Sequence, residues 1–90
     1  MKLVIVGTGY VGLVSGACFA EFGYKTICVD KDKDRIEKLN SGKCPFYEPG
    51  MDDLLSKHLK NTKLLTFSPS LKESMIDADI VFITVGTPNR

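Results

Sequence analysis

Three glycines stand within six residues near the start of the chain, in the sequence GTGYVG from Gly7 to Gly12. They follow directly after the apolar run 3–6. Glycine loses more backbone freedom on folding than any other residue, so three in so short a stretch indicate a structural requirement. Either the backbone turns where a Cβ atom would clash, or another group approaches the backbone closely. The chain must therefore fold so that a buried strand leads into a tight turn or into a site of close approach to the backbone.

Apolar runs and helical patterns alternate along the 90 residues. Continuous apolar runs predict strands of a parallel sheet, buried on both faces, at 2–6, 26–29, 64–67 and 80–85. Helical patterns predict helices at 10–22, 31–39 and 50–60 and a short helical turn at 70–76. Strands that alternate with helices imply right-handed crossovers. The predicted fold class is α/β, a partial doubly wound parallel sheet of Rossmann type with about four strands and flanking helices.

The first predicted helix carries apolar residues at helical spacing, namely Val11, Val14, Cys18 and Phe22. Gly12 and Gly16 are four residues apart, so we expect them to share one face and to permit close packing on the strand. We expect Cys18 and Cys28 to be reduced core residues. The cysteines are odd in number and form no CxxC pair, which is typical of a cytoplasmic protein.

Charge and composition exclude several classes of partner. The net charge of +1 gives no reason to expect binding to nucleic acid or to an anionic membrane. No apolar run approaches the roughly 20 residues of a membrane span. His58 is the only histidine, so we expect no metal site, and its place on the inner side of a helix predicts a packed or capping residue.

A strand followed at once by GxGxxG at the start of a helix is the arrangement that binds dinucleotides. Gly7 permits the tight turn, Gly9 lets a pyrophosphate approach the backbone, and Gly12 lets the helix lie close to the strand. The amides of Tyr10 and Val11 are then unpaired at a helix start, which favours negative charge. The alternative is a glycine-rich turn that binds nothing.

Asp30 ends the second predicted strand, 18 positions after Gly12. This is close to the spacing expected for the acid that accepts a hydrogen bond from the adenosine ribose. A carboxylate would repel a 2′-phosphate, so Asp30 favours NAD over NADP as the cofactor. Lys31, Lys33 and Arg35 could supply cations for a 2′-phosphate, but we interpret the two lysines as a solvated helix face. We expect Arg35 to reach the adenosine end of the cofactor.

The fourth predicted strand ends at the sequence TVGTP, residues 84–88. In a doubly wound sheet this strand lies beside the first, and the ligand crevice opens between their carboxyl ends. Gly86 and Thr87 are therefore expected to flank the pyrophosphate or the nicotinamide ribose. The alternative is a turn that only ends the strand.

The irregular segment 43–50 has a structural and a functional interpretation. Phe46 and Tyr47 could anchor it as hydrophobic contacts, or it could touch the ligand directly. Cys44 has no histidine nearby, which argues against a nucleophile.

Four segments together resemble the opening of the UDP-glucose/GDP-mannose dehydrogenases. They are MKLVIVGTGYVGL at 1–13, VD at 29–30, GKCPFYEPG at 42–50 and ADIVFITVGTP at 78–88. The resemblance implies oxidation of the C6 alcohol of a nucleotide sugar to a carboxylate, through two hydride transfers to NAD. It carries over the NAD site onto Gly7, Gly9, Tyr10, Val11, Gly12, Asp30, Arg35 and Thr87.

The resemblance also implies that the catalytic residues and the nucleotide-sugar site belong to later parts of a longer chain. None of Cys18, Cys28 and Cys44 matches the family's nucleophile, so no catalytic residue is expected here. We therefore interpret residues 1–90 as the N-terminal part of a Rossmann NAD-binding domain, inactive alone. Its apolar sheet edge at the fourth strand should promote homo-oligomers. The alternatives are a dehydrogenase of the hydroxyacyl-CoA or 6-phosphogluconate type, and a non-catalytic nucleotide-binding module.

Overall fold

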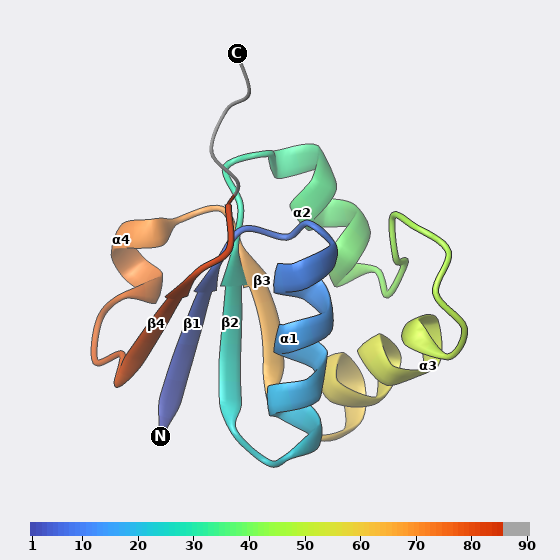
Figure 1. The fold of residues 1–90 in the computed structure, drawn as a ribbon, viewed down its shortest axis with the longest axis horizontal. Coiled ribbons are helices and arrows are strands. Elements are labelled where there is room, and N and C mark those ends of the chain that lie inside the picture. Colours follow the sequence, from blue (N-terminus) through green and yellow to red (C-terminus); the bar gives the residue numbers. More distant parts are fainter. Residues whose placement is uncertain (86–90) are drawn as a thin grey trace.

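The computed structural model describes residues 1–85, which form one parallel sheet flanked by helices (Figure 1). The elements are β1 (Lys2–Val6), α1 (Tyr10–Glu21), β2 (Lys25–Val29), α2 (Lys33–Asn40), α3 (Met51–Ser56), the π-helical turn η1 (Lys57–Asn61), β3 (Leu65–Ser68), α4 (Leu71–Ser74) and β4 (Ile80–Ile83). The strands are all parallel and lie in the order β3-β2-β1-β4. This confirms the predicted α/β class and the place of β4 beside β1.

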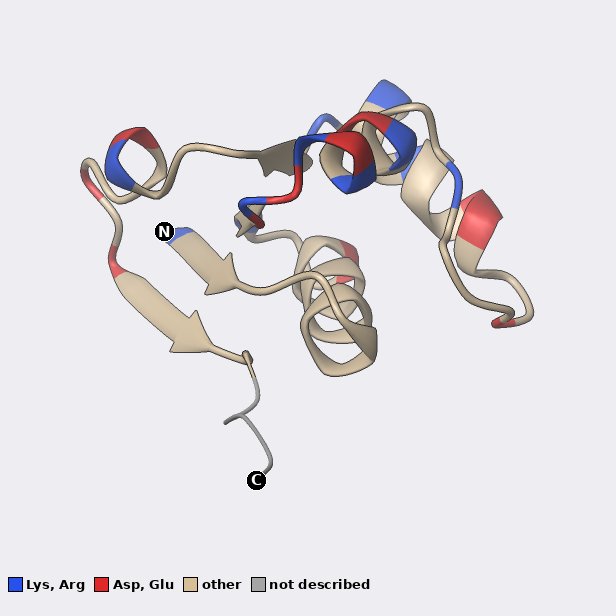
Figure 2. Ribbon diagram, turned by 90° about the horizontal axis from the view of Figure 1, so that it is seen from above, with Lys and Arg blue, Asp and Glu red and all other residues tan. Residues whose placement is uncertain are grey.

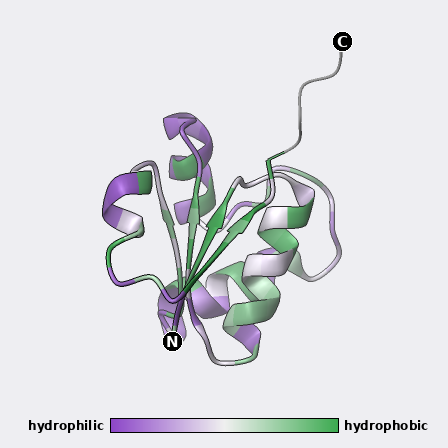
Figure 3. Cartoon of the chain, turned by 60° about the vertical axis from the view of Figure 1, so that its left-hand side comes forward, coloured by the Kyte–Doolittle hydropathy of each residue, from purple (hydrophilic) through white to green (hydrophobic). Residues whose placement is uncertain are grey.

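The core forms where the sheet meets α1. Val4 and Ile5 in the central strand β1 are fully buried, as are Leu13 and Ala17 on α1. The strands are among the most hydrophobic parts of the chain in Figure 3. In Figure 2, α1 and α4 lie on opposite faces of the sheet. A strand covered on both faces is apolar throughout, which explains why β1 has no alternating pattern.

Only part of the apolar pattern predicted for α1 faces the sheet. Val11 is 62% exposed, Phe22 is 76% exposed and Cys18 is exposed, so these residues do not form the core. The residues that α1 buries are Gly12, Leu13, Gly16, Ala17 and Ala20. The prediction of a core role for Cys18 was therefore wrong, because Cys18 lies on the exposed side of α1, whereas Val14 packs against the core. The prediction that Gly12 and Gly16 share the face packed on the strands is confirmed. Cys28 on β2 is buried as expected.

His58 is a packed residue, as predicted. Its side chain is nearly inaccessible, its Nε2 donates to Glu21 Oε1 at 2.7 Å, and its Nδ1 lies 2.8 Å from Thr62 Oγ1. The hydrogen bond with His58, followed by that from Lys57, lowers the pKa of the Glu21 carboxyl. These contacts tie η1 to the C-terminal end of α1, at the edge of the molecule away from the glycine turn.

Between residues 1 and 85, no helix has both the length and the apolar character that a membrane crossing requires.

Candidate dinucleotide-binding site

The turn between β1 and α1 is built around Gly7. Its φ of +113° lies in the region that L-residues avoid, so glycine is required there. The Gly7 amide donates to the Val29 carbonyl at 2.7 Å, and Thr84 Oγ1 donates to the Val6 carbonyl at 2.9 Å. The turn is thereby held from the strands on both sides of β1, which confirms the tight turn predicted at Gly7.

Gly12 and Gly16 bring α1 close to the strands. A Cβ on Gly12 would overlap the Gly7 carbonyl oxygen and lie 2.6 Å from Thr84 Oγ1. A Cβ on Gly16 would lie 2.5 Å from Cys28 Sγ. Real Cβ atoms do not approach other atoms this closely, so both positions need glycine for packing. The close contact predicted for Gly12 is confirmed.

The N-terminus of α1 has free amides beside open space. Gly9 is the residue before the helix, and the first intrahelical bond runs from the Leu13 amide to the Gly9 carbonyl at 2.9 Å. The amides of Tyr10, Val11 and Gly12 precede this bond and have no acceptor within the helix. A Cβ on Gly9 would meet no atom of the described residues within 4 Å. An anion of pyrophosphate size can therefore approach the amides at the positive end of the helix dipole.

Asp30 lies at the carboxyl end of β2, next to this turn. Its Oδ2 accepts from Thr8 Oγ1 at 2.6 Å and from the Thr8 amide at 3.3 Å, and its Oδ1 accepts from the Asp32 amide at 3.0 Å. Partial burial disfavours the charged form, but these hydrogen bonds and the Arg35 charge together outweigh it and lower the pKa of the Asp30 carboxyl. An ionised carboxylate at this place can accept hydrogen bonds from sugar hydroxyls.

Arg35 reaches the same turn from α2. Its Nη2 donates to the Thr8 carbonyl at 2.8 Å, and its Nε lies 3.2 Å from that oxygen and 2.9 Å from Thr8 Oγ1. The structure therefore brings Arg35 and Asp30 together through Thr8. Lys31 lies at the rim of the adjoining hollow, whereas Lys33 begins α2 on an exposed face, as predicted.

A hollow of about 390 Å³ opens beside Asp30, at the carboxyl ends of the strands. Its walls are mostly apolar. They are formed by Val6, Gly7, Val29, Asp30, Lys31, Pro69, Leu71 and Val85. Sequence reasoning missed Pro69 and Leu71 as candidates. The rule that ligands bind beyond the carboxyl ends of parallel strands could have found them, because Pro69 directly follows β3 and Leu71 begins α4 just after it.

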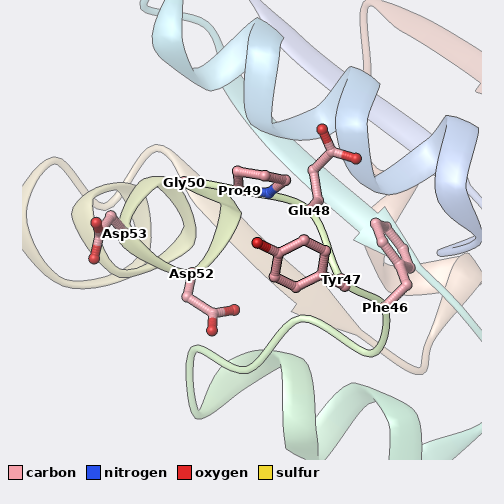
Figure 4. Close-up of a pocket in the computed structure, with 7 residues that line it drawn as sticks. All are labelled: Phe46, Tyr47, Glu48, Pro49, Gly50, Asp52 and Asp53. Carbon is pink, nitrogen blue, oxygen red and sulfur yellow. The ribbon is translucent and has the colours of Figure 1, made fainter.

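The segment 43–50 forms a second hollow of about 280 Å³ (Figure 4). Phe46 packs on Tyr10 with the ring centroids 5.2 Å apart, and the neighbouring Glu48 carboxylate raises the pKa of the Tyr10 phenol. Phe46 therefore anchors the segment against α1, as its structural interpretation predicted. Tyr47 does not, because it is 91% exposed. Its predicted role as an anchor was wrong.

Two predicted site residues, Gly86 and Thr87, lie outside the described residues. Within residues 1–85, no group of three or more histidine, cysteine or acidic side chains could hold a metal ion. The cysteines are free thiols, and burial raises the pKa of the Cys28 thiol to about 12, far from a reactive thiolate.

The glycine turn, the free helix amides and the acid at the end of β2 together define a Rossmann-type dinucleotide-binding domain. Residues 1–90 match the family described as the UDP-glucose/GDP-mannose dehydrogenase family, NAD binding domain. The chain belongs to this family, and the cofactor of the family domain is NAD. The match favours this family over dehydrogenases of the hydroxyacyl-CoA or 6-phosphogluconate type.

Two curated relatives are named UDP-glucose 6-dehydrogenase. The chain is 48% identical over 90 residues to a UDP-glucose 6-dehydrogenase of Rhizobium meliloti, covering 100% of this chain and 20% of the relative. It is 49% identical over 88 residues to the UDP-glucose 6-dehydrogenase of Pseudomonas aeruginosa, covering 98% of this chain and 19% of the relative. The chain thus spans about a fifth of the length of the curated relatives that it matches.

Solved structures share the fold. A GDP-mannose dehydrogenase from Pseudomonas aeruginosa in a ternary complex superposes with a TM-score of 0.93 at 38% identity, over 100% of this chain and 20% of that chain. A UDP-glucose dehydrogenase from Pyrobaculum islandicum superposes with a TM-score of 0.91 at 35% identity, over 99% of this chain and 20% of that chain. Both are nucleotide-sugar dehydrogenases by name.

Proposed function

We propose that this chain binds the ADP half of NAD at the β1–α1 turn. The amides of Tyr10 and Val11 hold the pyrophosphate over Gly9, and Asp30 accepts a hydrogen bond from the adenosine ribose. Arg35 lies at the adenosine end. Gly86 and Thr87, beyond β4, flank the pyrophosphate or the nicotinamide ribose.

One observation carries this proposal: an ionised carboxylate, free helix amides and an apolar hollow adjoin one another at a single edge of the sheet. The amides suit two phosphates, the carboxylate suits ribose hydroxyls, and the apolar walls near Pro69 and Leu71 suit a purine base. Asp30 also disfavours a 2′-phosphate, because like charges brought together repel. These features support NAD rather than NADP.

For the longer protein we propose oxidation of UDP-glucose to UDP-glucuronate, with residues 1–90 as the first part of its NAD-binding domain. Identities of 47–49% to relatives named UDP-glucose 6-dehydrogenase support this substrate. Three free cysteines support a cytoplasmic location. In residues 1–90 taken alone, the exposed side chains of Ile80 and Ile83 on the edge strand β4 support self-association into a homo-oligomer.

Titration of this chain with cofactors, followed by NMR amide shifts, tests the site. We expect NAD⁺ to bind weakly, with a Kd on the order of 1 mM, because residues 1–90 form only the first part of the proposed NAD-binding domain. NADP⁺ should bind at least about tenfold more weakly. Asp30→Asn should weaken NAD⁺ binding about tenfold, because it removes a charged hydrogen-bond acceptor, and should reduce the discrimination against NADP⁺.

The matched control is Asp34→Asn, which removes the same charge from the exposed first turn of α2 and should leave NAD⁺ binding unchanged. UDP-glucose should shift no amide of this chain. Tighter binding of NADP⁺ than of NAD⁺ would contradict the role of Asp30, and saturable UDP-glucose shifts would show that the sugar site has been misplaced.

The substrate is tested in the longer protein by NADH absorbance. We expect turnover of UDP-glucose with two NADH formed per sugar, and a kcat/KM at least about 100-fold above those for GDP-mannose and UDP-N-acetyl-mannosamine. A site that hydrogen-bonds one sugar discriminates by at least this ratio against sugars that leave its polar groups unpaired. A preference for either of the other two sugars would replace the proposed substrate, and absence of NADH formation with all three would favour a non-catalytic module.

A further inference from the structure

Thr8 stands between the first two glycines of GTGYVG and is only 1% exposed. A buried hydroxyl in a glycine turn needs hydrogen-bond partners. Thr8 finds them in the two residues that sequence spacing places at the adenosine end, Asp30 and Arg35. Its Oγ1 lies 2.6 Å from Asp30 Oδ2 and 2.9 Å from Arg35 Nε.

The direction of both hydrogen bonds follows from the chemistry of the partners. A guanidinium can only donate and an ionised carboxylate can only accept. The Thr8 hydroxyl therefore accepts from Arg35 and gives its single proton to Asp30. The Thr8 amide also points at Asp30 Oδ2, at 3.3 Å. The carboxylate is thus held in one orientation before any ligand arrives.

We infer that Thr8 is a positioning residue for cofactor selection, which orients the Asp30 carboxylate toward the adenosine ribose and holds the Arg35 guanidinium on the turn. This inference rests on the proposed NAD site. Oδ2 of Asp30 already accepts two bonds from Thr8, whereas Oδ1 accepts only the bond from the Asp32 amide and keeps lone-pair capacity to which a ribose hydroxyl can donate.

The hydrogen bonds from Arg35 to Thr8 affect the discrimination between NAD and NADP. Arginine beside the adenosine ribose is the residue that accommodates a 2′-phosphate in NADP-binding domains. Here Nε and Nη2 of Arg35 are both directed at Thr8, through its hydroxyl and its carbonyl oxygen. The Nε–Nη2 edge of the guanidinium is therefore engaged by Thr8 and not by a phosphate, while Asp30 faces the sugar.

Three variants test the inference in this chain. Thr8→Val keeps the shape but removes the hydroxyl, and should raise the Kd for NAD⁺ about tenfold while raising that for NADP⁺ less than about threefold. Thr8→Ser restores the hydroxyl and should return the Kd for NAD⁺ to within about twofold of the original chain. Thr66→Val makes the same chemical change at an exposed position on β3 and controls for general effects.

The carboxyl carbon of Asp30, followed by NMR against pH, gives a readout that a purely structural role would not move. Loss of the donated proton should raise the pKa of Asp30 in Thr8→Val, and Thr8→Ser should lower it again, because hydrogen bonds from Thr8 favour the ionised form. Should valine strain the turn and unfold the chain, Thr8→Ala removes the hydroxyl without adding bulk and makes the same comparison.

The inference is overturned if the valine or alanine variant binds NAD⁺ within twofold of the original chain, or if the pKa of Asp30 is the same in all variants. If the original chain itself binds no NAD⁺, the proposed function fails. If the original chain binds NAD⁺ and the variants bind it equally well, the role of Thr8 is wrong but the proposed NAD site stands.

Discussion

Replacement of Gly12 by alanine is expected to lower the free energy of unfolding by about 3–5 kcal/mol. The added Cβ would overlap the Gly7 carbonyl oxygen and lie 2.6 Å from Thr84 Oγ1. Neither atom can move cheaply. The Gly7 amide is bonded to Val29 across the turn, and Thr84 Oγ1 is bonded to the Val6 carbonyl. A 90-residue domain has about 5–13 kcal/mol of stability in total, so the loss would be severe.

The sign of the change in the free energy of unfolding shows whether packing or helix propensity dominates at Gly12. Alanine favours a helix interior over glycine by about 1 kcal/mol, so propensity alone would make Gly12→Ala more stable. Urea denaturation followed by circular dichroism measures the difference. Cys18→Ala, on the exposed face of the same helix, is the control and should change stability by less than about 0.5 kcal/mol. An unchanged or stabilised Gly12→Ala variant would mean that α1 can move off β1 at no cost.

The order of the elements could be predicted from the sequence because each one carries a local signal. The apolar run of β1 and the glycines after it mark a strand and a tight turn within a dozen residues. Gly23, with φ of +98°, ends α1 as expected for a helix stop. The Ser70 side chain accepts from the Glu73 amide and caps the N-terminus of α4. The parallel order of the strands then follows from connectivity, since α/β alternation permits few arrangements.

Apolar spacing alone could not predict the inner face of α1, whereas the two glycines four residues apart, Gly12 and Gly16, did indicate it. The helix carries one charged residue, Glu21, and hydrophobic side chains on several sides, so its polarity does not distinguish one face (Figure 2). The face against the sheet is chosen by size, because the turn at Gly7 and the Cys28 side chain leave no room for a Cβ at Gly12 or Gly16. This lack of room arises from contacts between strand and helix, so the spacing of hydrophobic residues along the helix does not reveal it.

The site could be predicted only in part for the same reason. Spacing along the chain located Asp30, because the length of α1 and β2 sets its distance from the glycines. The role of Thr8 depends on where side chains from β2 and α2 converge, which the spacing does not specify. The exposure of Tyr47 depends on the path of a segment without regular structure, whereas Phe46 next to it packs on Tyr10.

Replacement of Gly9 by alanine is expected to weaken NAD⁺ binding strongly while the fold persists. Gly9 has φ of −72° and ψ of −169°, an extended conformation that alanine adopts freely. Its Cβ would meet no atom of the described residues within 4 Å, so stability should change by less than about 1 kcal/mol. The same methyl group would occupy the space in which we place the pyrophosphate. Overpacking of this kind costs about 1–3 kcal/mol, so the Kd for NAD⁺ should rise about tenfold to hundredfold.

Urea denaturation of the Gly9→Ala variant and NMR titration with NAD⁺ separate the two effects. Adenosine provides an internal control because it carries no phosphate. It should shift the amides of Val29 and Lys31 equally in the original chain and in the variant, since these residues line the apolar hollow and not the helix terminus. If the variant binds NAD⁺ as the original chain does, the pyrophosphate does not lie over Gly9, and the free amides of α1 lose their assigned ligand. If adenosine binding is lost as well, the substitution has disturbed the apolar hollow. The weaker NAD⁺ binding of the variant would then not be caused by a methyl group in the pyrophosphate space at Gly9.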